Sequence, residues 1–207
     1  MFADPELTVG LPAAVTAATG IDALTHNLES FLSPAYHPLC DGIALEGARL
    51  AAGALRTAVL RPGNLQARGD MMMASMMGAI AFQKDLGAVH SCAHALGAVC
   101  DLHHGLANAL MLEPVMSFNL PAAPERFARL AQATGAGAPD AFVDWLRRLK
   151  ADIGIPPSLA AAGVRREQFE RLADIAVADI CHRTNPRPCS REDFLRFFEA
   201  AWAGSAG

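Results

Sequence analysis

The sequence is short of the features that mark several protein classes, and each absence excludes a function. The 207 residues contain no run of lysine or arginine and no basic stretch interleaved with aromatic residues, and the formal net charge is -4 at pH 7. We therefore expect no nucleic acid and no anionic membrane as a partner. No apolar stretch reaches the length of a membrane span without glycine, proline or charge. The N-terminus lacks the basic segment of a signal peptide, which predicts a cytoplasmic protein.

Cysteine is present, but it is not arranged for cross-linking. The cysteines are odd in number and form no CxxC pair; they are Cys40, Cys92, Cys100, Cys181 and Cys189. This pattern is typical of reduced thiols rather than of a disulfide framework.

Alternating strand patterns are missing as well. Alanine and leucine dominate, and long segments place apolar residues three and four apart between glycines and prolines, which predicts helices. With 52% hydrophobic residues the chain can bury a sizeable core. We predict an all-α, multi-helix bundle. The expected helices cover residues 11–19, 20–32, 37–60, 65–84, 88–99, 104–120, 124–134, 138–152, 166–180 and 190–203.

The helices divide into two parts by their content. Residues 1–120 contain the candidate metal ligands, and residues 121–207 are expected to form a trailing helical bundle. The methionine-rich segment 71–77 is expected to fill gaps in the core rather than to bind a soft metal.

Histidine is concentrated in one short segment, 87–105, which holds four of the seven. His90 and His94 are four residues apart, so they share one face of a helix, and Asp22 and His26 repeat that spacing elsewhere. One carboxylate and three imidazoles, drawn from these residues and from His104, can then surround a cation. Oxygen and nitrogen ligands without thiolate favour Fe(II) or Zn(II).

For His104 to join the site, the chain must bring it back close to the other ligands. A break at Leu96-Gly97 is expected to let the chain swing back before the next helix begins. For a single histidine the simpler alternative is a hydrogen-bonded core residue, and a lone Asp/His pair can be a surface contact. The joint spacing within an apolar stretch favours the metal, because unpaired buried histidines are costly.

Four motifs carry a family resemblance. They resemble the iron-containing (group III) alcohol dehydrogenases, and the similarity covers essentially the whole chain. The motifs are residues 20–26 (GIDALTH), 41–46 (DGIALE), 86–109 with its four histidines, and 185–193 with Asn185-Pro186-Arg187-Pro188 and Arg191-Glu192-Asp193. The implied fold is the helical C-terminal domain of dehydroquinate synthase-like and iron-type alcohol dehydrogenases.

The resemblance also implies roles for individual residues. His94 is implied to lie beside nicotinamide and substrate as a proton-relay or positioning residue, and Phe82 and Cys181 match positions near the substrate pocket. The implied metal ligands are Asp22, His26, His90 and His104. The implied cofactors are Fe(II), with Zn(II) as an alternative, and NAD(P). The implied reaction oxidises a small alcohol to an aldehyde or ketone with hydride transfer to NAD(P).

Members of the family have a second, N-terminal α/β domain that binds NAD(P), and we expect it to be absent here. The nearest approach to a dinucleotide motif is Gly135 and Gly137, a lone GxG with no strand before it, which is typical of a connector. Three alternatives follow: a dehydrogenase represented by its catalytic domain, a metal-binding domain without activity alone, and a metal-dependent hydrolase. If the other domain is missing, helices near 88–110 should expose apolar side chains and the chain should self-associate or form a homo-oligomer.

Overall fold

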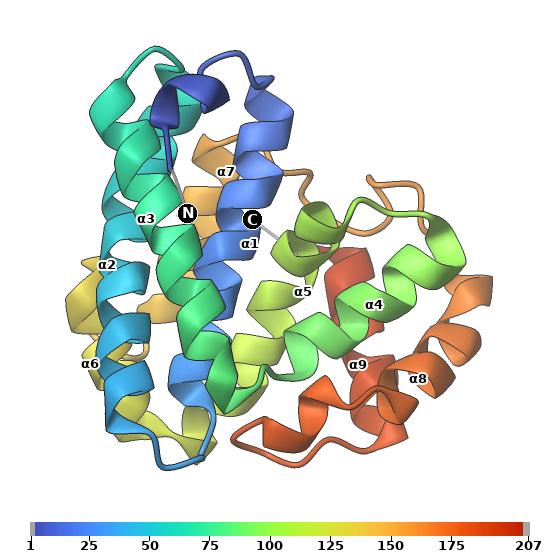
Figure 1. Cartoon of the computed structure of the whole chain (residues 1–207). Helices are drawn as coiled ribbons and strands as arrows, with labels where there is room; N and C mark the ends of the chain where they lie inside the picture. The colour runs from blue at the N-terminus through green and yellow to red at the C-terminus, as the bar shows by residue number, and fades with distance from the viewer. Residues whose placement is uncertain (1–2, 205–207) are drawn as a thin grey trace.

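The computed structural model describes residues 3–204, and the regular structure in that range is entirely helical (Figure 1). The prediction of an all-α bundle is confirmed. The longer helices are α1 (Ala13–Leu32), α2 (Pro38–Leu60), α3 (Leu65–Ala81), α4 (Ala88–Cys100), α5 (His104–Asn119), α6 (Pro124–Thr134), α7 (Phe142–Asp152), α8 (Phe169–Ala178) and α9 (Arg191–Ala203). Short 3-10 turns cover η1 (Pro5–Thr8), η2 (Phe82–Lys84), η3 (Leu120–Ala122), η4 (Arg166–Gln168) and η5 (Cys181–Thr184). Within residues 3–204, none of the helices combines the length and hydropathy that a membrane span needs.

The helices pack as two groups that share one core. Helices α1, α2 and α3 lie side by side, while α4, α8 and α9 gather on the other side of α5 (Figure 1). Helix α5 contacts both α1 and α4, so it connects the groups. One buried apolar cluster takes side chains from every α-helix of the described chain.

Two expected helix breaks are absent. Residues 11–19 and 20–32 were expected to be separate helices, but α1 runs through Gly20. A side chain there would place its Cβ 2.2 Å from Leu55 Cδ1, so this glycine serves the close approach of α2. Gly97 likewise lies inside α4, which continues to Cys100. The reversal occurs at Asp101, whose φ of 52° is in the left-handed region.

The methionine-rich segment fills the core less than predicted, since only Met71 packs against it. None of its methionines is fully buried, and Met73 is 47% exposed. Helix α3 instead turns its small residues inward, with Ala74 and Gly78 against α1, while Met71 packs partly buried at the edge of the core. Met71 and Met76 help line an open groove of about 400 Å³ beside η1 and α1.

The expected apolar face on residues 88–110 is also not found. Val89 and Leu96 are buried, because α4 is covered by α5 and α8. The exposed large hydrophobic residues of the described chain all lie elsewhere: Leu7, Leu11, Tyr36, Leu39, Leu60, Leu65, Met73, Ile80, Phe82 and Ile180. The GxG segment is a connector as predicted, since Gly135 ends α6 with a positive φ of 77°.

A buried ion pair fixes the start of α2 against η2. The fully buried Lys84 donates from Nζ to the backbone oxygen of Ser33 at 2.9 Å and to the Asp41 carboxylate. Arg126 of α6 donates to the same carboxylate at 3.2 Å. Burial raises the pKa of Asp41, but the hydrogen bonds from Lys84 and Arg126 outweigh burial and hold that pKa below its ordinary value.

We expect Asp41→Asn to lower the free energy of unfolding by about 3 kcal/mol at pH 7, because it leaves the Lys84 ammonium buried without its counter-charge. The pKa of Asp41 is lower in the folded than in the unfolded protein. Its contribution to the free energy of unfolding is therefore complete above the unfolded pKa of about 3.9 and is lost as pH falls through the folded pKa. Urea denaturation of both proteins should show the gap narrowing below about pH 4.

The matched control is Glu46→Gln, which removes a surface pair with Arg49 and should change the free energy of unfolding by less than about 0.5 kcal/mol. Equal losses in Asp41→Asn and Glu46→Gln, or a gap between Asp41→Asn and the wild type that stays constant with pH, would contradict the assignment.

Candidate metal centre

Three helices bring the predicted ligands to one place. Asp22 lies on α1, His90 on α4, and His104 is the first residue of α5. Asp22 Oδ1 is 3.7 Å from His90 Nε2 and 3.5 Å from His104 Nε2. Ligand atoms of these three residues all lie within 4.8 Å of one another. The arrangement follows from the packing of α5 against both α1 and α4.

His26 lies against this cluster with one nitrogen already engaged. Its Nδ1 is 2.8 Å from the backbone oxygen of Asp22, one helical turn earlier, and 3.3 Å from Asp22 Oδ1. The ring centroids of His26 and His90 are 4.5 Å apart. A proton on Nδ1 satisfies the backbone oxygen and leaves Nε2 with a lone pair that can bind a cation.

A second carboxylate, which was not predicted from the sequence, supports His90 from behind. Glu29 Oε2 accepts from His90 Nδ1 at 2.6 Å, and Oε1 accepts from the backbone N–H of Val89 at 2.7 Å. Both side chains of the Glu29–His90 pair are 1% exposed. With its proton on Nδ1, His90 presents Nε2 as a lone pair, the carboxylate–histidine arrangement typical of metal sites. The signal in the sequence was Glu29 seven residues after Asp22, on the same face of α1.

Asn108, which was not predicted from the sequence, marks the point where the acceptor atoms converge. Its Nδ2 lies 2.7 Å from Asp22 Oδ1, 3.1 Å from His104 Nε2 and 3.4 Å from His90 Nε2. Its Oδ1 is buried with no hydrogen-bond partner. The amide therefore directs its positive end at Asp22 Oδ1 and at the ring nitrogens of His104 and His90. A divalent cation satisfies the same three atoms, so the donor set fits a metal ion.

The electrostatics of the cluster favour positive charge. Burial raises the pKa of Asp22, but hydrogen bonds from His26 and His90 outweigh burial and hold that pKa well below its ordinary value. Burial lowers the pKa of His90, yet Asp22 and Glu29 overcome it and raise the pKa to about 9. Burial lowers the pKa of His104. The Asp22 carboxylate thus stays ionised in a half-buried site, which stabilises a bound cation.

His94 lies at the open side of the cluster. Its ring stacks on that of His104 with centroids 5.5 Å apart, and its side chain is 43% exposed. Nδ1 of His94 is 2.9 Å from Asp179 Oδ2. Burial raises the pKa of Asp179, but its hydrogen bonds, first of all that from His94, lower it to about 2. The carboxylate fixes the proton of His94 on Nδ1 and directs Nε2 away from Asp179.

The two residues matched to the substrate pocket lie on different sides of the site. The ring of Phe82 is 45% exposed and meets His26 edge-on at 6.2 Å between centroids. Cys181 begins η5 and lies in one group with His94 and Asp179. Burial, and then the Asp179 charge, raise the pKa of the Cys181 thiol to about 12.

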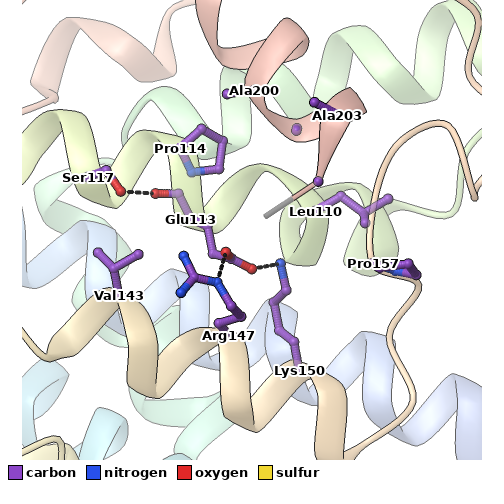
Figure 2. Close-up of a pocket in the computed structure, with 12 residues that line it drawn as sticks. Leu110, Glu113, Pro114, Ser117, Val143, Arg147, Lys150, Pro157, Ala200 and Ala203 are labelled. Atoms are coloured by element: carbon purple, nitrogen blue, oxygen red, sulfur yellow. Dashed lines mark hydrogen bonds and ion pairs between the residues drawn. The ribbon is translucent and has the colours of Figure 1, made fainter. Parts of the chain in front are cut away.

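A separate cavity of about 430 Å³ lies between α5, α7 and the end of α9 (Figure 2). None of the candidate ligands lines it. Its charged centre is Glu113, which contacts Arg147 Nε at 3.1 Å and Lys150 Nζ at 2.5 Å. These ion pairs hold α5 against α7, so the charged residues of the cavity wall have a structural role.

Comparison with known families identifies the family to which the chain belongs. The sequence model described as "Fe-containing alcohol dehydrogenase family, C-terminal" matches residues 16–202, which is nearly the whole chain. The chain belongs to this family. The family assignment and the helical fold expected from the four motifs are therefore confirmed.

Several curated dehydrogenases of this family are similar in sequence. The 4-hydroxybutyrate dehydrogenase of Cupriavidus necator is 43% identical over 209 residues, covering 95% of this chain and 54% of that protein. The 1,3-propanediol dehydrogenase of Klebsiella pneumoniae is 40% identical over 208 residues, covering 96% of this chain and 54% of that protein.

Solved structures of family members share the fold. A 1,3-propanediol oxidoreductase superposes with a TM-score of 0.93 at 40% identity, over 96% of this chain and 55% of that one. The sulfoacetaldehyde reductase of Bifidobacterium kashiwanohense, solved in complex with NAD+, gives 0.88 at 30% identity over 96% and 53%. The chain thus spans about half the length of the relatives it matches.

Proposed function

We propose that this chain is the metal-bearing part of an NAD(P)-dependent alcohol dehydrogenase. The observation that carries the proposal is the convergence of Asp22 Oδ1 with His90 Nε2 and His104 Nε2, with Glu29 behind His90. Asp22, His26, His90 and His104 are the residues that would hold the ion. We propose Fe(II), with Zn(II) as the alternative ion that the same ligands accept.

A divalent cation in this site supplies Lewis acidity, which polarises a carbonyl oxygen or stabilises an alkoxide. The protein's own residues would accept the proton and contact the substrate. His94 keeps its Nδ1 proton on Asp179, so Nε2 is the atom that accepts the proton of the alcohol. The exposed ring of Phe82, beside His26, offers an apolar wall to the substrate chain.

We propose small primary alcohols or hydroxy acids as substrates, with the corresponding aldehydes as products. The names of the curated relatives support this class: they include a 4-hydroxybutyrate dehydrogenase and a lactaldehyde reductase of Escherichia coli. The other partners we propose are NAD(P), an α/β nucleotide-binding domain and further copies of this chain. A cytoplasmic setting is part of the same proposal.

The second candidate function is metal binding without activity of the chain alone. It is favoured by one observation, that the regular structure of residues 3–204 is entirely helical and so contains no strand–turn–helix motif for a dinucleotide. The same experiment separates it from the first.

The test loads the anaerobically purified chain with Fe(II) and measures bound iron, then titrates NADH and NADPH by fluorescence. We expect one Fe(II) per chain in the wild type and none in His90→Ala, while the control His103→Ala, an exposed neighbour of the site, keeps the metal. Saturable nucleotide binding supports the dehydrogenase. Stoichiometric iron without nucleotide binding supports the second candidate, and the absence of iron from the wild type would overturn both.

A further inference from the structure

A second set of ligand atoms converges beside the first, and it contains sulfur. A ring nitrogen of His94, a carboxylate oxygen of Asp179 and Sγ of Cys181 lie within 4.8 Å of one another. His94 comes from α4, whereas Asp179 and Cys181 come from the link between α8 and η5. We propose that these three residues form a second metal site, selective for thiolate-preferring cations such as Zn(II), Co(II) or Cd(II).

The site is held in shape by hydrogen bonds that do not depend on an ion. Asp179 Oδ1 accepts from Ser91 Oγ at 2.8 Å and from the backbone N–H of Cys181 at 2.8 Å. Ser91 Oγ in turn accepts from the backbone N–H of His182 at 3.0 Å. The α8–η5 link is therefore fastened to α4, and the ligands need no rearrangement of the backbone to meet a cation.

The ligand chemistry separates this site from the one proposed for Fe(II). One nitrogen, one oxygen and one sulfur from the protein, with solvent in the remaining position, is a combination that Zn(II) and its substitutes accept. His94 and Asp179 have side chains 43% and 19% exposed, so an ion can enter from solvent. The two sites share no residue, and the Fe(II) site offers no sulfur.

Ion binding at the second site is a proton exchange. The S–H bond of Cys181 breaks, a bond from sulfur to the metal forms, and the proton passes to solvent. With Nδ1 of His94 as the nitrogen ligand, its proton moves from Nδ1 to Nε2, and the ion replaces the hydrogen bond to Asp179. One proton is released for each ion bound.

This site has a consequence for catalysis, which rests on the proposed function. An ion that occupies His94 removes Nε2 as a proton acceptor while the metal at Asp22 and His90 stays in place. A thiolate-preferring cation such as Cd(II) should then inhibit while the first site keeps its metal.

The experiment titrates Co(II) into the metal-free chain and follows the thiolate-to-cobalt charge-transfer band in the near ultraviolet. Only a sulfur ligand produces this band, so the first site is silent in it. We expect the band in the wild type, its loss in Cys181→Ser, and at least tenfold weaker binding in Asp179→Asn and in His94→Ala. The control Cys100→Ser, a partly buried cysteine at the end of α4, should keep the band.

The result separates the two proposals. His90→Ala should lose cobalt from the first site and keep the band, so failure of one site leaves the other measurable. If Cys181→Ser does not fold, His94→Ala provides the test instead. His94 is exposed, so this variant is expected to fold, and circular dichroism checks that it does. A wild type without the band at saturating Co(II), or a band that persists in folded Cys181→Ser or at full strength in His94→Ala, would overturn the second site.

Discussion

Replacement of Glu29 by glutamine should lower the affinity for Fe(II) or Co(II) by about 10- to 100-fold, although Glu29 is not itself a proposed ligand. The carboxylate lies 2.6 Å behind His90 and holds the proton of that ring on Nδ1. An amide of the same shape removes the negative charge that makes Nε2 a stronger donor, and its NH2 end is repelled by the Val89 and His90 donors that Glu29 accepts from.

Competition against a chelator of known affinity measures the loss directly. The matched control is Glu113→Gln, which neutralises another largely buried carboxylate, remote from the site and paired with Arg147 and Lys150 (Figure 2). It should affect stability but leave metal affinity within about twofold of the wild type. Equal affinity in Glu29→Gln and the wild type would show that Glu29 does not act through His90.

A second large effect is expected from a single methyl group at Gly105. A Cβ at this position would lie 2.3 Å from the backbone oxygen of Ala18 and 2.6 Å from its carbonyl carbon. Backbone atoms of a buried helix cannot move aside as a side chain can, so Gly105→Ala must separate α5 from α1. We expect a loss of about 3 kcal/mol in the free energy of unfolding, measured by urea denaturation.

The same substitution should weaken metal binding, because Asp22 lies on α1 and His104 on α5. The control is Gly53→Ala in α2, where a Cβ would meet nothing within 4 Å. That change should stabilise the fold by about 0.5–1 kcal/mol, since alanine is the better helix former. Comparable destabilisation by both alanines would refute the close approach of α1 and α5.

The sequence predicted the parts of the site that depend on local spacing. Asp22 with His26, and His90 with His94, were paired because residues four apart share a helix face. Glu29 was within reach of the same reasoning. Asp179 was not, because its position beside His94 depends on how the α8–η5 link packs against α4, and no local pattern contains that contact.

Glycine and methionine show a different limit. A glycine within a helical pattern can break the helix or admit a neighbour, and only the neighbour decides which. Gly20 and Gly97 were expected to interrupt helices, yet both lie inside them. The methionine segment was ambiguous because α3 itself carries apolar residues on several of its faces. The sequence therefore did not reveal which face of α3 turns inward.

The separation of the ligands along the chain determines when the ion can arrive. His90 and the Glu29 carboxylate that supports it are 61 residues apart in sequence, and the proposed ligands come from three helices. An unfolded chain offers the ion only scattered single ligands and short local pairs, so α1, α4 and α5 must dock before a complete site exists. Metal capture is therefore a late step in the life of a newly made chain. The ion then stabilises the native state by mass action, and a cell short of metal would contain the same fold in a less durable form.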